Sequence, residues 1–479
     1  MGNNIKHKIL SGVFWKFLER AMAQLVSMLV AIVLARLLNP GDYGTIALVT
    51  IFITIANVFV TDGFGSSLIQ KKDADNVDFS TVFYFNIVFC LFLYSIVFWV
   101  APFVASFYEK PILTPVLRVL AIKILISSLN SVQHAYVARN MLFKRFFYST
   151  LIGTIISAFV GIWMAYHRFG VWALVAQELT NCTIDMIVLW FTVKWRPSLN
   201  FSVYRLKELF DYGWKLLVQS LLNNIYGNLR NLIIGKVYSS EDLAYYTKGS
   251  YYPNLIIANI DTALNSALFP AMSHEQEDVA RVKLIARRSL SMCSYVLSPV
   301  LVGFAVTAPT IVNLVLTAKW LPIVPFIKIF CASLMLRPAL TAMLQAVKAV
   351  GNSNLVLKYD IPLRIIGICL IIVTVKFGTI YIALGEVVVE IVGLFLYSIA
   401  CKKSIDYSLF EVLKDVIPNI LGAIIMGIIV YFVGLYFYSI PNVICLLIQI
   451  FAGVVSYIGI SLLTKNENFM QVLKIINKR

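Results

Sequence analysis

The sequence predicts an all-α, polytopic membrane protein with about fourteen transmembrane helices. Hydrophobic residues make up 60% of its 479 residues and charged residues only 13%, whereas roughly a quarter of the residues in a soluble protein are charged. The mean hydropathy is +0.83. Apolar runs long enough to cross a bilayer recur along the whole chain, and no connection between them is long enough for a folded domain.

The predicted spans lie on apolar runs of roughly 17–25 residues. The first run is long and interrupted by charge, so we expect a retained span and not a cleaved signal peptide. The spans cover residues 11–37, 43–64, 81–106, 113–137, 146–166, 169–193, 209–236, 243–270, 285–307, 324–347, 355–375, 378–400, 413–437 and 441–464. An even number of spans places both termini on the same side of the membrane.

The distribution of positive charge predicts which side that is. With both termini inside, the inner segments carry 24 lysines and arginines and the outer turns carry 6. This asymmetry sets the orientation of a membrane protein, so both termini are expected in the cytoplasm. The net charge of +16 therefore reflects membrane orientation, and no nucleic-acid partner is predicted.

The chain contains an internal repeat with a shift of about 200 residues. Corresponding pairs include Gly12 with Gly213, Trp15 with Trp214, Lys16 with Lys215 and Asp42 with Asp242. Six spans per copy keep the orientation, so the copies would form two parallel, pseudo-symmetric six-helix lobes. The predicted domains are an N-lobe at residues 1–200, a C-lobe at residues 201–403, and two additional spans with a basic tail at residues 404–479. Chance similarity between apolar sequences is the alternative.

Polar side chains form a stripe along the first span and again along the seventh. The first stripe consists of Lys16, Arg20, Gln24 and Ser27. The second consists of Lys215, Gln219, Asn223, Tyr226 and Arg230. Residues at this spacing share one face of a helix. Because a charge at mid-membrane costs about 2.5–3.5 kcal/mol, the two stripes are expected to face a common, cationic cavity.

Three further cations within spans, Arg118, Lys328 and Arg337, are assigned to the same cavity. Cations at several depths suit a phosphate-bearing ligand, because arginine offers paired hydrogen bonds and lysine a point charge.

Simpler roles remain open for several of these cations. Lys16 and Lys215 lie near the cytoplasmic face and can snorkel to it. Arg20 can form a structural pair with Glu19, and Arg118 and Arg230 lie near the expected outer interface.

Acidic residues within the spans have two possible roles. They are Glu19, Asp62, Glu178, Asp185, Asp261, Glu386 and Glu390. They can neutralise the buried cations, or they can bind a coupling proton or sodium ion. Charge pairing is favoured, because buried charges are usually paired.

No enzyme, metal or cofactor site is predicted. The seven cysteines and four histidines are dispersed without metal-ligand or disulfide spacing. The sequence has no phosphate-binding loop, and Gly63-Phe64-Gly65 is an isolated turn, not a dinucleotide fingerprint.

A distinctive set of residues surrounds the first two spans. It consists of Gly12-x-x-Trp15, Gln24, Leu34-Ala35-Arg36-Leu37-Leu38-x-Pro40-x-Asp42-Tyr43-Gly44, Gly63-Phe64-Gly65 and Leu68-Ile69-Gln70-Lys71. This pattern resembles the N-terminal signature of Wzx-type polysaccharide flippases, in the branch similar to colanic acid and teichuronic acid exporters. That family belongs to the multidrug/oligosaccharidyl-lipid/polysaccharide (MOP) exporter superfamily.

The resemblance implies two six-helix lobes around a cationic cavity, with two C-terminal helices beside them. It also implies that an undecaprenyl-pyrophosphate-linked oligosaccharide is moved from the inner to the outer leaflet of the bacterial cytoplasmic membrane by alternating access. A polysaccharide polymerase and chain-length machinery are possible partners. Two other functions remain open: a drug/cation antiporter of the same superfamily, and an integral-membrane polysaccharide polymerase or ligase.

Overall fold

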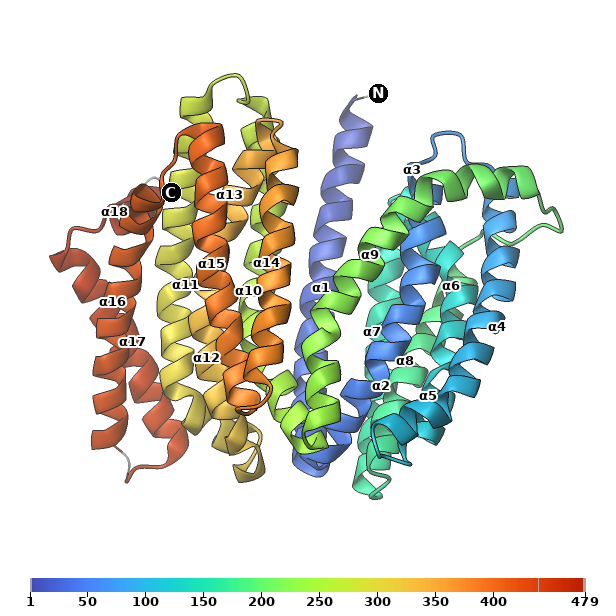
Figure 1. The fold of residues 1–479 in the computed structure, drawn as a ribbon, viewed down its shortest axis with the longest axis horizontal. Coiled ribbons are helices and arrows are strands. Elements are labelled where there is room, and N and C mark those ends of the chain that lie inside the picture. The colour runs from blue at the N-terminus through green and yellow to red at the C-terminus, as the bar shows by residue number, and fades with distance from the viewer. Residues whose placement is uncertain (1, 438, 477–479) are drawn as a thin grey trace. The chain divides into compact units, whose positions relative to one another are not determined.

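The computed structural model describes residues 2–437 and 439–476, except for the side chains of residues 2–14, 16, 17, 20, 21, 62, 63, 212, 259, 263, 265, 266 and 472–476. Every secondary-structure element of the described residues is a helix. This is the expected solution in a bilayer, where each backbone N–H and C=O must find its partner within the protein. The helices form two compact units, Met1–Ala244 and Tyr245–Arg479 (Figure 1).

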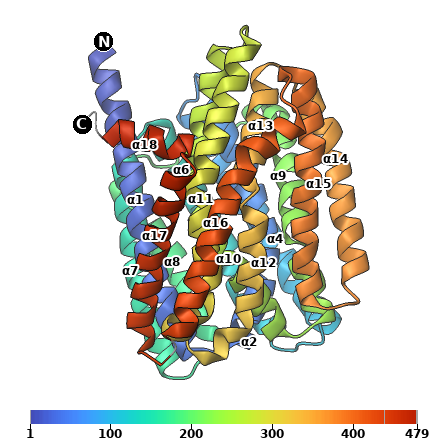
Figure 2. The ribbon, with the colours of Figure 1, turned by 90° about the vertical axis from the view of Figure 1, so that its left-hand side faces the viewer.

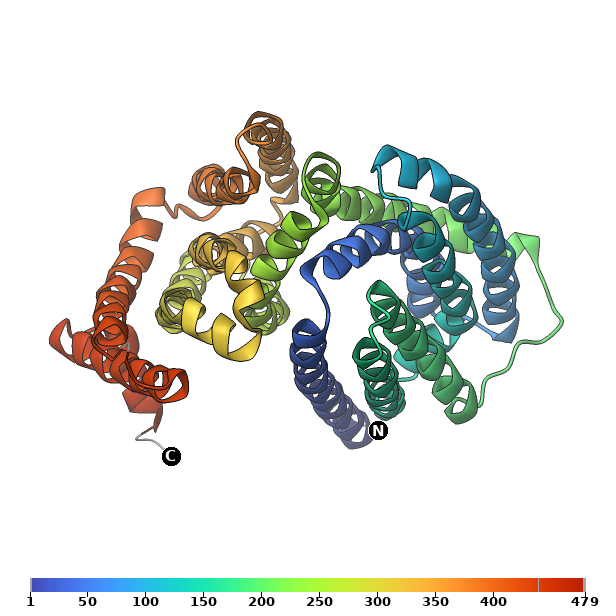
Figure 3. The same ribbon diagram turned by 90° about the horizontal axis from the view of Figure 1, so that it is seen from below.

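The first unit is built around a row of long helices. Its elements are α1 (Gly2–Leu37), α2 (Pro40–Val58), the π-helix η1 (Phe59–Gly65), α3 (Ser66–Gln70), α4 (Asn76–Phe107), α5 (Leu113–Leu120), α6 (Ile122–Arg139), α7 (Phe143–Tyr166), α8 (Val171–Thr192), α9 (Val203–Val237) and the start of α10 (Ser240–His274). Helix α7 packs between α1 and α8 (Figure 3). Glycines make the contact with α8 close, because a Cβ atom at Gly153 would lie 3.2 Å from the carbonyl oxygen of Asn181.

The second unit contains the rest of α10 and nine further elements. They are α11 (Val279–Val315), the 3₁₀-helix η2 (Ala318–Ile323), α12 (Val324–Leu334), α13 (Arg337–Ala349), α14 (Ser353–Thr374), α15 (Thr379–Ile405), α16 (Leu409–Tyr436), α17 (Asn442–Leu463) and α18 (Glu467–Ile476). Helices α16 and α17 pack against each other and against α11. The short α18 lies across the end of α17 (Figure 2).

The predicted spans all fall on helices. Three of them are composite, and the structure gives their full extents as Pro40–Gln70, Leu113–Arg139 and Ala318–Ala349. Within the described part of the chain, nine helices are long and apolar enough to cross a membrane, and α10, which bends by 43° after Ala258, makes a tenth. The all-α, multi-pass class is therefore confirmed, and the count of fourteen is consistent with the helices but stays a prediction.

The two compact units do not divide the chain where the predicted lobes do. Helix α9 packs against α2, α4 and η1, so by contact it belongs to the first unit. The predicted lobe boundaries were placed from the sequence repeat, whereas the compact units are defined by contacts. The lobe boundaries stay a prediction.

The turns that follow α1 and α9 have the same local geometry. The backbone N–H of Asn39 donates to Asp42 Oδ2 at 3.1 Å, and that of Ser239 donates to Asp242 Oδ2 at 3.2 Å. In both cases a carboxylate in the first turn of a helix satisfies a backbone donor just before it. Helices α2 and α10, which follow α1 and α9, therefore start in the same way, as the sequence repeat predicts for corresponding positions.

Gly44 allows two backbones to touch within the first unit. A Cβ atom on Gly44 would lie 1.8 Å from the carbonyl oxygen of Ser240, at the start of α10. No side chain fits at that distance. The glycine that ends the Pro40-x-Asp42-Tyr43-Gly44 run is therefore explained by close packing.

We expect Gly44→Ala to destabilise the protein. The added methyl group forces the backbones of α2 and α10 apart, and overpacking of this kind costs about 1–3 kcal/mol. Thermal unfolding of the purified protein in detergent should show a lower midpoint. Gly65→Ala is the matched control, because a Cβ atom at Gly65 meets nothing within 4 Å; equal midpoints for the two variants would contradict the packing argument.

Candidate functional site

The polar stripe predicted on α1 is only partly described. The side chains of Lys16 and Arg20 lie outside the described residues, and Gln24 is half-buried. Helix α1 is continuous from Gly2 to Leu37. The three positions therefore keep the helical spacing that puts them on one face, and the role of the two cations stays a prediction.

The corresponding stripe on α9 changes from exposed to buried along the helix. Lys215, Gln219 and Asn223 follow one another at single-turn intervals and are exposed. Arg230 is only 5% exposed, and its guanidinium lies 5.8 Å from the centre of the Tyr226 ring. Three polar residues of α9 are thus accessible to a ligand, and the arginine beyond them is enclosed by protein.

Arg118 and Lys328 have separate surroundings. The Nε atom of Arg118 donates to the carbonyl oxygen of Phe98 at 3.1 Å, and its guanidinium lies 4.0 Å from the centre of the Phe98 ring. A cation above an aromatic face is stabilised electrostatically, so α4 holds Arg118. Lys328 on α12 is exposed.

Arg337 of the second unit is held by an acidic residue. It donates to Glu390 Oε1 at 2.9 Å, and Glu390 is only 9% exposed. One turn further along α13, the hydroxyl of Thr341 donates to Asp261 Oδ1 at 2.7 Å. Glu386, one turn before Glu390 on α15, is half-buried. Helices α10, α13 and α15 therefore share a polar contact region within the second unit.

A second pair joins α6 to α8 in the first unit. The Nζ atom of Lys123 lies 2.8 Å from Glu178 Oε2. Glu19 of α1 accepts a hydrogen bond from the hydroxyl of Thr150 at 3.3 Å, and the side chain of Asp62 lies outside the described residues. Glu178 and Glu390 each pair with a cation, and the choice between charge pairing and ion coupling as the role of the acidic residues stays a prediction.

Asp185 lies in a polar cavity of the first unit. The cavity has a volume of about 420 Å³ and is bounded by η1, α3, α6, α7 and α8. Asp185 Oδ2 accepts from Asn130 Nδ2 at 2.7 Å and lies 2.9 Å from His134 Nε2. Asn130 is 4% exposed, and its Oδ1 atom has no hydrogen-bond partner among the described residues. The Asp185 carboxylate is therefore held by side chains of α6 at the wall of this cavity.

His134 was not predicted to be a site residue. Only the fold brings it to Asp185, because the two residues are 51 positions apart. A sequence signal does exist, since Asn130 and His134 stand one turn apart in an apolar span. No group of three or more metal-ligating side chains occurs among the residues that the structure describes.

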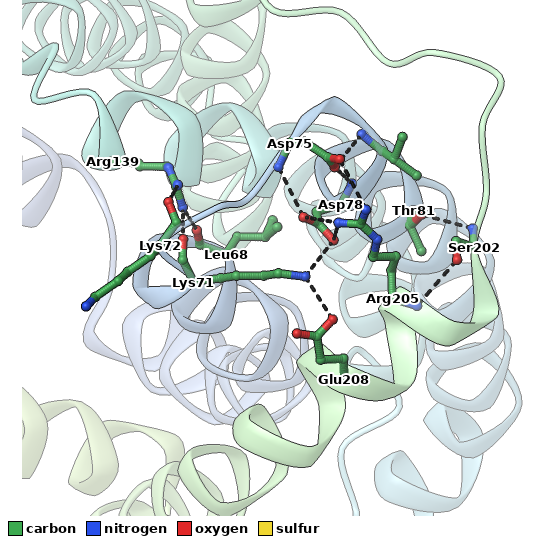
Figure 4. Close-up of polar contacts among 11 residues, drawn as sticks. Leu68, Lys71, Lys72, Asp75, Asp78, Thr81, Arg139, Ser202, Arg205 and Glu208 are labelled. Atoms are coloured by element: carbon green, nitrogen blue, oxygen red, sulfur yellow. Dashed lines mark hydrogen bonds and ion pairs between the residues drawn. The ribbon is translucent and has the colours of Figure 1, made fainter.

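A charge network joins the turn before α4 to the start of α9 (Figure 4). The carboxylate of Asp78 is fully buried and lies 3.1 Å from Lys71 Nζ. It also lies 3.1 Å from the Nη1 atom of Arg205. Lys71 in turn lies 2.9 Å from Glu208, and the backbone N–H of Asp75 donates to Asp78 at 3.1 Å. The buried carboxylate is satisfied by two cations and a backbone donor.

Arg139 ties the end of α6 to the same turn (Figure 4). It donates to the carbonyl oxygens of Leu68, Lys71 and Lys72. These carbonyls end α3 and begin the turn, so they have no partner within a helix. Because its charged groups are paired, the network is a structural joint of the first unit and not a ligand site.

Lys71 and Asp75 have pKa values shifted in the directions that favour their charged forms. Burial lowers the pKa of Lys71, but hydrogen bonds to Glu208 and Asp78 outweigh that effect and place the pKa above its ordinary value. The hydrogen bond from the Asp78 backbone N–H lowers the pKa of Asp75. The contribution of Lys71 to stability is therefore lost only as the pH rises through its raised pKa, and that of Asp75 only as the pH falls through its lowered pKa.

We expect Asp78→Asn to weaken the joint between the α4 turn and α9. The neutral side chain removes the buried counter-charge that Lys71 and Arg205 share and leaves each cation with one exposed carboxylate, Glu208 and Asp75 respectively. Removing one partner of a largely buried pair costs about 2 kcal/mol or more. The thermal midpoint should fall, and protease cleavage near residues 193–202 should become faster. Asp73→Asn, an exposed change in the same turn, is the control; an equal effect of both changes would contradict a special role for Asp78.

We expect a charge swap to separate pairing from ion binding at Lys123 and Glu178. Lys123→Glu and Glu178→Lys should each lower the thermal midpoint, because each places two like charges 2.8 Å apart. The double variant should recover at least half of the loss. Absence of recovery would mean that the two residues do more than neutralise each other.

Comparisons with known proteins point to one family. A family model described as "Polysaccharide biosynthesis protein" matches residues 33–325. The chain is 22% identical to the teichuronic acid biosynthesis protein TuaB of Bacillus subtilis (strain 168), over 95% of each chain. It is 19% identical to the lipopolysaccharide biosynthesis protein WzxC of Escherichia coli (strain K12), over 81% of this chain and 80% of that protein.

Solved structures resemble the fold as a whole. The lipid II flippase MurJ, in an inward closed conformation, matches with a TM-score of 0.73 over 95% of this chain and 99% of its own, at 14% identity. An inward-facing multidrug resistance transporter of the MATE family, in the MOP superfamily, matches with a TM-score of 0.62 over 83% of this chain and 99% of its own, at 13% identity. The chain therefore shares its fold with these two solved structures.

Proposed function

The chain belongs to the polysaccharide biosynthesis protein family, and we propose that it is a flippase for a lipid-linked oligosaccharide used in surface polysaccharide biosynthesis. The observation that carries the proposal is the match to TuaB over 95% of both chains. The two proteins therefore share their whole architecture and not one module. A protein of that length built from membrane helices is suited to moving a polysaccharide precursor across the bilayer.

Export is favoured over synthesis by the absence of an extramembrane module. The longest connection between described helices is residues 193–202. A membrane polymerase or ligase is expected to place its chemistry on a sizeable loop outside the bilayer. Within the described residues no such loop is present.

The proposed substrate is an undecaprenyl-pyrophosphate-linked repeat unit. Its pyrophosphate would meet Lys16 and Arg20 on α1 and the exposed polar edge of α9, while the sugars occupy water-filled space and the polyprenyl tail stays in lipid. Alternating access would then expose the substrate to the outer leaflet. With a negative cell interior, outward passage of each negative charge gains about 2.3 kcal/mol per 100 mV if it crosses the full field. The acidic residues leave an ion antiport open as a second driving force.

The proposed location is the bacterial cytoplasmic membrane with both termini in the cytoplasm. The excess of lysine and arginine on the inner segments supports this orientation. A polysaccharide polymerase and its chain-length machinery would act on the product at the outer face.

The rival within the superfamily is a drug/cation antiporter. Such a transporter would rely on carboxylates in its cavity, whereas two of the acidic residues here are held by Lys123 and Arg337. Transport of labelled lipid-linked oligosaccharide into inverted vesicles, measured beside drug efflux and sugar-chain extension, separates the flippase from both rivals. Drug efflux or chain extension without oligosaccharide transport would overturn the proposal.

We expect Arg20→Ala to abolish surface polysaccharide while protein levels in the membrane stay normal. The corresponding position of α9 holds Gln219, so the repeat itself does not require a cation at position 20. We therefore assign Arg20 to the pyrophosphate, and its removal should prevent substrate binding. The readout is surface polysaccharide on intact cells, with the membrane content measured by immunoblot. Lys72→Ala, which removes an exposed cation outside the helices, is the control; unchanged export by Arg20→Ala would remove Arg20 from the site.

A further inference from the structure

The second unit contains a cavity that no step of the proposed transport uses. It has a volume of about 620 Å³ and lies between one end of α11, the start of α16, the end of α17 and the start of α18. This size is within the range of small-molecule sites. Charged residues line it near the helix ends and apolar residues line it further along α16, so the cavity changes from polar to apolar along that helix.

At the polar end, the charged side chains outside ion pairs are mostly cations. Arg287, Lys414 and Lys465 line the cavity together with Asp415 and Glu467. Arg287 donates to both oxygens of Asp415 at 2.7 Å. Lys414 and Lys465 are exposed and form no ion pair among the described residues.

The carboxylate of Asp415 already has a cationic partner and a hydroxyl donor. Besides the two bonds from Arg287, it accepts from the hydroxyl of Tyr407 at 2.7 Å. Its charge is cancelled by the guanidinium beside it. The electrostatics at the polar end therefore depend on Lys414 and Lys465 against Glu467, which favours an anion.

The other end of the cavity is lined by exposed apolar side chains. Leu421 and Ile425 line the cavity, and their exposed fractions are 53% and 49%. They lie about 10 Å and 16 Å along α16 from Lys414 at 1.5 Å per residue. A headgroup near Lys414 would thus have its acyl chains beside these two side chains.

We propose that this cavity binds an anionic membrane phospholipid. The phosphate and any further negative group of the head would lie between Lys414 and Lys465, with Ser291 and Asn468 at the rim. The acyl chains would cover Leu421 and Ile425. Basic pockets between helix ends are a recognised form of anionic lipid binding. The site is separate from the stripes of α1 and α9, and bound lipid would fasten α18 to the ends of α16 and α17.

The test uses the full-length protein purified in a neutral detergent. Phosphatidylglycerol and phosphatidylcholine with the same acyl chains are added, and thermal unfolding and native mass spectrometry measure stabilisation and bound lipid. Phosphatidylglycerol should raise the unfolding midpoint more than phosphatidylcholine. Each basic group near an anionic lipid surface contributes about fivefold in affinity, or ~1 kcal/mol, so Lys414→Gln with Lys465→Gln should weaken phosphatidylglycerol binding about 25-fold.

The control is Lys402→Gln with Lys403→Gln, which removes the same charge from exposed positions at the end of α15. It should leave the phosphatidylglycerol effect intact. Both variants should unfold at the wild-type midpoint without added lipid, and Lys465→Gln keeps a side chain at the positive φ of 50° found there. If Lys414→Gln with Lys465→Gln retains the lipid effect, or if the control loses it equally, the proposal is overturned. Equal stabilisation by inorganic phosphate alone, or by a polyprenyl phosphate in place of phosphatidylglycerol, would also overturn it.

Discussion

A charge inside a membrane-length helix has to be neutralised within the protein or reached by water, and both units are organised around this requirement. Lys123 is held by Glu178, and Arg337 is held by Glu390. The first pair lies beside further polar contacts between α6 and α8, because Asn130 and His134 both contact Asp185. A buried pair adds little net stability; its effect here is to fix which helices lie together and in which register.

The helix ends are governed by a different constraint, because backbone groups there lack partners within the helix. Arg139 supplies three hydrogen bonds to the carbonyls after α3, and Asp42 and Asp242 satisfy the donors before α2 and α10. The same need explains Asp42 of the signature, whose carboxylate accepts from the backbone N–H just before α2. The segment of the signature from Leu34 to Gly44 therefore covers the end of α1 and the start of α2.

Periodicity and span length were sufficient to predict the helices, since each of those signals is local. The family was predicted from a short signature and is confirmed by a model that matches residues 33–325. The residues that meet in space could not be predicted in the same way. Asp185 and His134 are brought together across 51 positions, and Asp78 reaches Arg205 across 127. No pattern within one span encodes such a pairing, because it depends on how two helices pack.

Helix α9 shows why these long-range contacts matter for transport. Its first turns are bound to α4 and to the turn before it through Asp78, Lys71 and Arg205, while its middle presents Lys215 and Gln219 as an exposed polar edge. In an alternating-access cycle the start of α9 therefore has to move with the first unit. The exposed edge at Lys215 and Gln219 lies on the same continuous helix as Arg205. A substrate that binds this edge is therefore held by the first unit through the contacts of Asp78.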